Sequence, residues 1–180
     1  MLHGKYVSDY TLQNTLAPDG RQRTVSVYGG PVFRFVKKGA ELRRARLRLV
    51  VYTAICLLAL MAILLLPAPS LHMWYVLPPL AFALLPAAGV AACAVTLTAK
   101  NTLERRQKDK RAGGLRPRSA VLAVLALLSL AGQAVYMLGA GGAGLDAAVG
   151  ICTLVTAACA IRIFFLGKDF VLEEEKNEAL

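Results

Sequence analysis

The 180-residue chain has few acidic side chains and few charges of any kind. Asp and Glu together number 11, and charged residues make up only 18% of the sequence. It also has only four cysteines and two histidines, and no cysteine lies in a CxxC pair or close to a histidine. Metal sites and disulfide frameworks need such clusters. We therefore expect the cysteines to be small buried side chains, and we expect no metal and no cofactor.

Catalytic sequence motifs are also lacking. The chain contains no HExxH, no G-x-S-x-G and no Asp-rich metal motif. Residues 139–144 read GAGGAG and match G-x-G-x-x-G, but a dinucleotide site needs a strand before the glycines, where we expect an apolar helix. The glycines are better explained as a flexible link between two helices. The sequence thus predicts a protein that is not an enzyme.

The chain does contain long apolar runs. Hydrophobic residues make up 57% of the sequence, and its mean hydropathy is +0.54. These values are typical of a chain whose solvent is largely lipid. A hydrocarbon core of about 30 Å requires about 20 apolar residues in a helix. Four runs meet that requirement and predict transmembrane spans at about residues 47–66, 72–99, 119–138 and 145–166. The predicted fold class is an all-α integral membrane protein whose four transmembrane helices form a bundle.

The formal net charge of +10 is unevenly distributed along the chain. All 21 Lys and Arg residues lie at or before Arg48, in a central loop of residues 100–118, or at and after Arg162. No aromatic-basic recognition motif accompanies them, so we expect no nucleic-acid binding. Cytoplasmic loops of membrane proteins are rich in Lys and Arg. The charges therefore predict a multi-pass protein of the plasma (inner) membrane, with both termini and the central loop cytoplasmic.

The segments outside the spans divide the chain into three parts. Residues 1–40 are polar and lack the apolar core of a signal peptide. Turn signals and alternating sequences predict a small cytoplasmic β-meander there, with strands near residues 11–16, 21–28 and 32–36. A disordered basic tail is the alternative, because few apolar residues are available for a core. The four-helix transmembrane domain covers residues 41–166, and an acidic cytoplasmic tail covers residues 167–180. We expect this tail to rest loosely near the basic central loop.

Prolines interrupt the second apolar run. Pro78 and Pro79 each lack a backbone N–H donor, so a helix through residues 72–99 either kinks at this pair or begins there.

Basic residues next to the spans are candidate contacts for anionic lipid headgroups or for a protein partner. These candidates are Arg105, Arg106, Lys108, Lys110, Arg111 and Arg162. Arg162 differs from the others because it lies inside the fourth predicted span, about one turn before its end. Its side chain either extends to the headgroup region or binds a lipid headgroup or another anionic ligand.

Small side chains recur every four residues along the fourth span. They are Gly144, Ala148, Cys152, Thr156 and Ala160. Membrane helices can approach closely along such a row. We therefore predict that this face is buried against protein and that Val149 and Ile163 lie on other faces.

Taken together, these features predict a small polytopic membrane protein that acts as a non-enzymatic accessory, regulatory or structural subunit. It would act through helix packing and a basic cytoplasmic face. A small oligomeric transporter or channel is the alternative. The expected partners are the lipid bilayer, anionic lipid headgroups, and either another membrane protein or further copies of this chain.

Overall fold

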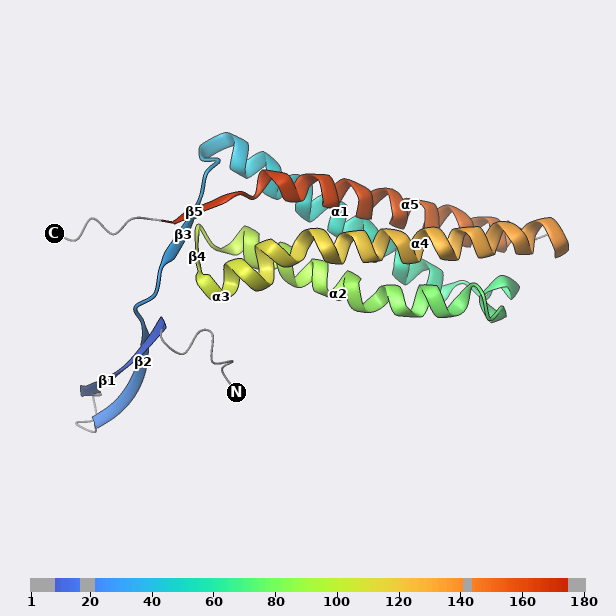
Figure 1. The fold of residues 1–180 in the computed structure, drawn as a ribbon. Helices are drawn as coiled ribbons and strands as arrows, with labels where there is room; N and C mark the ends of the chain where they lie inside the picture. Colours follow the sequence, from blue (N-terminus) through green and yellow to red (C-terminus); the bar gives the residue numbers. More distant parts are fainter. Residues whose placement is uncertain (1–8, 17–21, 141–143, 175–180) are drawn as a thin grey trace.

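The computed structural model describes residues 9–16, 22–140 and 144–174. This described part is mostly helical and contains four helices that are long and apolar enough to cross a membrane. They are α1 (Gly39–Leu65), α2 (Leu77–Ala99), α4 (Gly113–Ala140) and α5 (Gly144–Leu166). Figure 1 shows the four helices side by side in an elongated bundle, with the strands gathered at one end. The architecture agrees with the predicted four helices and is consistent with a multi-pass membrane protein.

Helix α1 begins well before the predicted start of the first span near residue 47. It starts at Gly39, whose φ of 62° is a left-handed conformation that favours glycine and turns the chain into the helix. The following stretch, ELRRARLRL, consists mainly of good helix formers. The helix therefore extends beyond the apolar run at this end.

Helix α2 begins at the proline pair, which is the second of the two expected alternatives for the run 72–99. A short 3-10 helix, η2 (Pro69–His72), occupies the link, and α2 starts at Leu77 with Pro78 and Pro79 in its first turn. Proline is tolerated there because the first N–H groups of a helix have no intrahelical acceptor.

Most of the central basic loop is ordered as secondary structure. Strand β4 (Thr102–Glu104) is followed by a single helical turn, α3 (Arg105–Gln107), a π-helical segment, η3 (Lys108–Ala112), and then α4. At its other end α4 includes the first two residues of GAGGAG, and α5 begins at the last one. Residues 141–143 lie outside the described part, so the predicted flexible link is not tested there.

Each of the four long helices packs against two others. Contacts join α1 to α2, α2 to α4, α4 to α5, and α5 to α1. Leu60, Ile63 and Leu122 are buried among small side chains in the interior. Large apolar side chains also cover the outside, where Leu85 is 74% exposed and Leu138 is 89% exposed. Lipid would accommodate such outward apolar surface, and water would not.

The predicted packing face of α5 is only partly buried. Gly144 is exposed, Ala148 and Cys152 are half-buried, and Thr156 and Ala160 are buried. A row at four-residue spacing turns by about 40° per step around an ideal helix, so its two ends face different directions. Val149 and Ile163 are fully buried, and the prediction that they lie on other faces was wrong. The buried face of α5 therefore contains large and small side chains.

The N-terminal strands form at the predicted places but do not pair as a meander. Strands β1 (Tyr10–Leu16) and β2 (Gln22–Tyr28) make an antiparallel hairpin. Strand β3 (Val32–Phe35) instead lies between β4 and β5 (Leu172–Glu174) in a three-stranded sheet. The predicted meander was thus wrong for β3. Phe33 and Phe35 lie on the same face of this strand, and both are buried at the end of the bundle.

Candidate functional site

The three-stranded sheet forms a cap on one end of the bundle, hereafter the capped end. It joins the N-terminal segment, the central loop and the C-terminal tail, which lie far apart in sequence. Phe35 is 2% exposed, and its ring contacts that of Phe170 edge-on with centroids 6.2 Å apart. Together with Leu103 and Leu115, these rings continue the core of the long helices. The cap and the bundle therefore share one apolar core.

Polar contacts also hold the cap to the helices. The Lys37 ammonium group lies 2.6 Å from Oδ1 of Asp169, which joins the segment after β3 to the segment after α5. Arg46 of α1 donates to Oδ1 of Asn101 at 2.9 Å and to the carbonyl oxygen of Lys100 at 2.5 Å. Its guanidinium also lies 5.1 Å from the centroid of the Phe35 ring. These contacts fix the positions of the basic segments.

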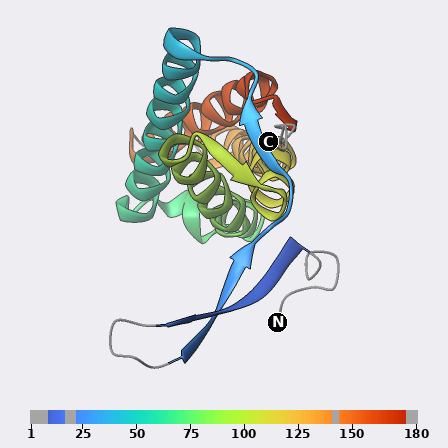
Figure 2. The same cartoon turned by 90° about the vertical axis from the view of Figure 1, so that its left-hand side faces the viewer.

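The β1–β2 hairpin is attached to the cap through tyrosine hydroxyls. The hydroxyl of Tyr28 accepts the Arg105 backbone N–H at 3.0 Å, and that of Tyr10 donates to Oε2 of Glu104 at 3.2 Å. Burial, together with the neighbouring Glu104 carboxylate, raises the pKa of Tyr10, so this phenol stays protonated and able to donate. Beyond these contacts the hairpin projects away from the bundle, as Figure 2 shows.

The candidate residues of the central loop lie together at the capped end. Arg105 and Arg106 belong to α3, whereas Lys108, Lys110 and Arg111 belong to η3. A guanidinium nitrogen of Arg105 lies 3.9 Å from the Asp9 carboxylate, so Arg105 forms an ion pair within the protein. The side chains of Arg106, Lys110 and Arg111 line a hollow of about 230 Å³ with Tyr10 and Glu104.

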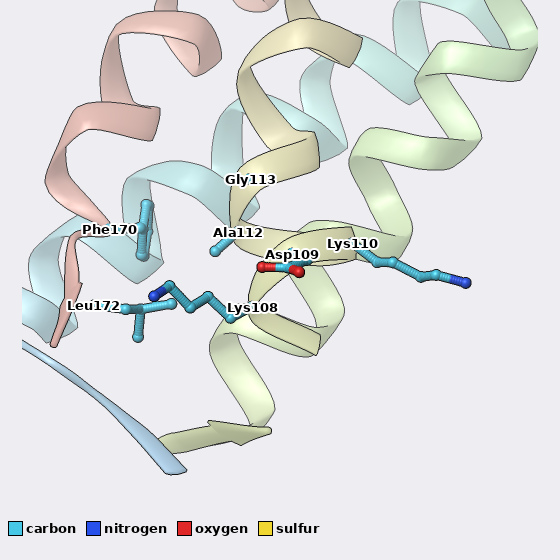
Figure 3. A pocket seen from close by; sticks show the side chains of 7 residues that line it. All are labelled: Lys108, Asp109, Lys110, Ala112, Gly113, Phe170 and Leu172. Atoms are coloured by element: carbon cyan, nitrogen blue, oxygen red, sulfur yellow. The ribbon is translucent and has the colours of Figure 1, made fainter. Parts of the chain in front are cut away.

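The hollow shown in Figure 3 is larger, with a volume of about 600 Å³. It lies between η3 and the segment that follows α5, and its walls are both apolar and charged. The lining residues are Lys108, Asp109, Lys110, Ala112, Gly113, Phe170 and Leu172. In Figure 3 the Lys108 side chain extends toward Leu172, and Lys110 points away. Because the Lys108 ammonium lies 3.8 Å from the Phe33 ring centroid, it already has a cation–π partner.

Arg162 does not join the residues of the central loop. It lines a separate hollow of about 240 Å³ between α1 and α5, where Arg48 is the second basic residue. The structure therefore divides the six candidate residues between two places at the capped end, five in the central loop and one near the end of α5.

The sequence analysis missed a buried polar cluster at the opposite end of the bundle. The side-chain nitrogen of Gln133 donates to Oγ of Ser70 at 3.0 Å and to the backbone oxygen of Asp146 at 2.7 Å. The Asp146 carboxylate in turn accepts the Ser70 backbone N–H at 3.0 Å. All three residues are buried. Gln133 could have been found as the one amide in the predicted third span, because polar side chains in apolar runs often bond between helices.

Arg118 was overlooked as an interhelical contact. Its guanidinium donates to Sγ of Cys93 at 2.9 Å and to the carbonyl oxygen of Lys110 at 3.2 Å. The side chain also covers Gly89, where an added Cβ would lie 2.8 Å from Cδ of Arg118. Small residues of α2 thus make room for an arginine of α4, which ties the start of α4 to its neighbour.

In comparisons with known proteins, no protein-family model, no curated protein and no solved structure matches this chain. The contacts and charges of the chain itself are therefore the basis for its proposed function.

Proposed function

We propose that this protein is a non-enzymatic accessory, regulatory or structural subunit of the plasma (inner) membrane. It acts through helix packing and a basic cytoplasmic face. The observation that carries the proposal is the cap, in which one sheet gathers three distant segments, with their basic residues, at the end of the bundle. Such a charged surface suits contacts with anionic headgroups and with a protein partner.

The proposed orientation places the capped end in the cytoplasm. The three basic segments all lead into this end, whereas the link at η2 and the GAGGAG segment contain no Lys or Arg. The positive-inside rule then assigns the links to the opposite side of the membrane.

Single-cysteine labelling tests this orientation. In a variant lacking the four native cysteines, we expect a membrane-impermeant maleimide to label His72→Cys in intact cells and Lys110→Cys only after lysis. Both native side chains are exposed, so access to either cysteine depends on the membrane and not on burial. Ser70 is buried and would be a poor reporter of the external side. Labelling of Lys110→Cys in intact cells would show that the capped end faces outward, opposite to the proposed orientation.

The projecting hairpin supports a role in binding a protein partner. Val25 and Val27 lie on one face of β2, and both side chains are exposed. A two-stranded sheet of this kind is marginally stable by itself in water. A partner that covers the valines would bury apolar surface and stabilise the hairpin.

Purification in mild detergent tests the role directly. We expect a larger protein to remain bound in fixed stoichiometry, and Val25→Asp to abolish its retention by placing a charge in the contact. Ser26→Asp adds the same charge on the opposite face of the strand and serves as the matched control. A homo-oligomer that supports solute flux in liposomes would instead favour the alternative, a small transporter or channel. The buried Ser70–Gln133–Asp146 cluster is the feature that would support this alternative, since polar groups within apolar bundles can mark transport pathways.

A further inference from the structure

The hollow between α1 and α5 at the capped end combines two arginines with apolar and aromatic side chains. Its lining residues are Arg48, Tyr52, Arg162, Phe165, Leu166 and Asp169, around a volume of about 240 Å³. Arg48 and Tyr52 come from α1, and Arg162 comes from the last turns of α5. Two helices thus bring two arginines to one small hollow.

The arginines of this hollow are available to an anion. Among the residues that the structure describes, neither Arg48 nor Arg162 has a hydrogen bond or an ion pair, and both side chains are exposed. Asp169 is the only acidic lining residue, and its carboxylate is bound to Lys37 at 2.6 Å. The hollow therefore has a positive balance of charge. Guanidinium groups can bind phosphate oxygens through paired N–H donors.

The surroundings of the hollow favour a lipid over a free phosphate ion. One or two turns farther along the helices, toward the middle of the bundle, Val51 and Ile55 on α1 and Leu154 on α5 are exposed. Arg162 lies about 6 Å along the axis from the end of α5, which corresponds to the depth of a headgroup phosphate when the helix ends at the membrane surface. Acyl chains can then lie along the exposed apolar side chains while the phosphate meets the arginines.

We propose that this hollow binds one anionic phospholipid, with its phosphodiester held between Arg48 and Arg162. A zwitterionic phosphatidylcholine carries the same phosphodiester, but its choline cation would lie beside the two guanidinium groups and weaken the attraction. The inference deepens the proposed basic face and rests on the capped end meeting the headgroups of one leaflet. It does not depend on a protein partner.

The test is a titration of the purified full-length protein in neutral detergent micelles, with bound lipid counted by native mass spectrometry. We expect one phosphatidylglycerol to bind saturably, and phosphatidylcholine to bind more weakly. Each of Arg48→Gln and Arg162→Gln should reduce phosphatidylglycerol affinity about fivefold, from the loss of one cation near an anionic headgroup. Arg162→Lys keeps the charge but loses the forked donor geometry, so its affinity should lie between those of wild type and Arg162→Gln.

Arg44→Gln is the matched control, because Arg44 is an exposed arginine of the same helix that does not line the hollow. Its affinity should stay within about twofold of wild type if binding depends on the hollow and not on general charge. An equal loss in Arg44→Gln would overturn the proposal, as would equal binding of the two lipids. Displacement of phosphatidylglycerol by millimolar inorganic phosphate would identify a free-anion site instead. If no protein partner is retained after purification in mild detergent, the proposed function fails, but the result of this lipid titration does not change.

Discussion

Replacing Phe35 by alanine should open the cap and expose the backbone of β3 to solvent. Phe35 is 2% exposed and contacts Phe170, and it lies at the junction between the sheet and the long helices. Removing a buried phenylalanine side chain typically costs about 3 to 5 kcal/mol. The cap shares its apolar core with the long helices, so this loss weakens the contact that holds the sheet to the bundle.

Hydrogen exchange measures this effect at the amides of residues 32–35. A loss of about 3 to 5 kcal/mol should accelerate their exchange by roughly 100-fold to 4,000-fold, because each 1.4 kcal/mol is about tenfold. Phe82→Ala is the matched control, since Phe82 is 63% exposed on α2 and belongs to neither buried cluster. We expect the β3 amides of the Phe82→Ala variant to exchange at the wild-type rate. If the two variants exchange alike, the cap does not depend on the core around Phe35.

The four long helices could be predicted from the sequence because their signal is local. Each apolar run contains enough consecutive residues for a span, and one long apolar helix lies in each of the four runs. The boundaries shifted where local chemistry outweighed hydropathy. Helix formers extended α1 back to Gly39, and the pair Pro78 and Pro79 determined where α2 begins.

The cap could not be predicted because its pairing is not local. The alternation at residues 32–36 correctly indicated a strand, but it contained no information about which strand lies beside it. The partners of β3 are two three-residue strands, and Arg34 aligns with Thr102 on one side and with Glu173 on the other. Segments as short as these have no detectable period of their own. Residues 172–174 of the acidic tail form an ordered strand on the opposite side of β3 from β4. Residues 175–180 lie outside the described part, so the expected loose contact of the tail with the basic loop stays a prediction.

The sequence could predict which basic residues lie next to the spans, but it could not predict which of them line the same hollow. Charge density identified the central loop and Arg162, but a hollow forms only where two elements meet. Arg48 of α1 belongs to the Arg162 hollow solely because α1 and α5 pack together. Gln133 and Asp146 likewise meet only because α4 and α5 pack together, and the sequence alone does not show that packing.

The second large effect is expected for Gln133→Ala at the opposite end of the bundle. The variant loses two buried hydrogen bonds, to Ser70 and to the backbone of Asp146, at 3.0 and 2.7 Å. Interhelical side-chain hydrogen bonds in membrane proteins contribute about 0.6 to 1.7 kcal/mol each. The truncation also leaves a cavity beside Gly150, where an added Cβ would lie 3.6 Å from Cγ of Gln133. Together these losses should lower the free energy of unfolding by on the order of 2 to 4 kcal/mol.

Unfolding by sodium dodecyl sulfate in mixed micelles, followed by circular dichroism, measures this loss and separates its two causes. Gln133→Leu nearly preserves the volume and removes only the hydrogen bonds, so it should cost about 1 to 2 kcal/mol. Gln107→Ala is the matched control, because Gln107 accepts an exposed hydrogen bond from Lys100 at the capped end and should cost less than about 0.5 kcal/mol. A Gln133→Ala variant as stable as Gln107→Ala would show that the polar cluster does not hold the helices together. A leucine variant as unstable as the alanine variant would assign the whole effect to hydrogen bonding.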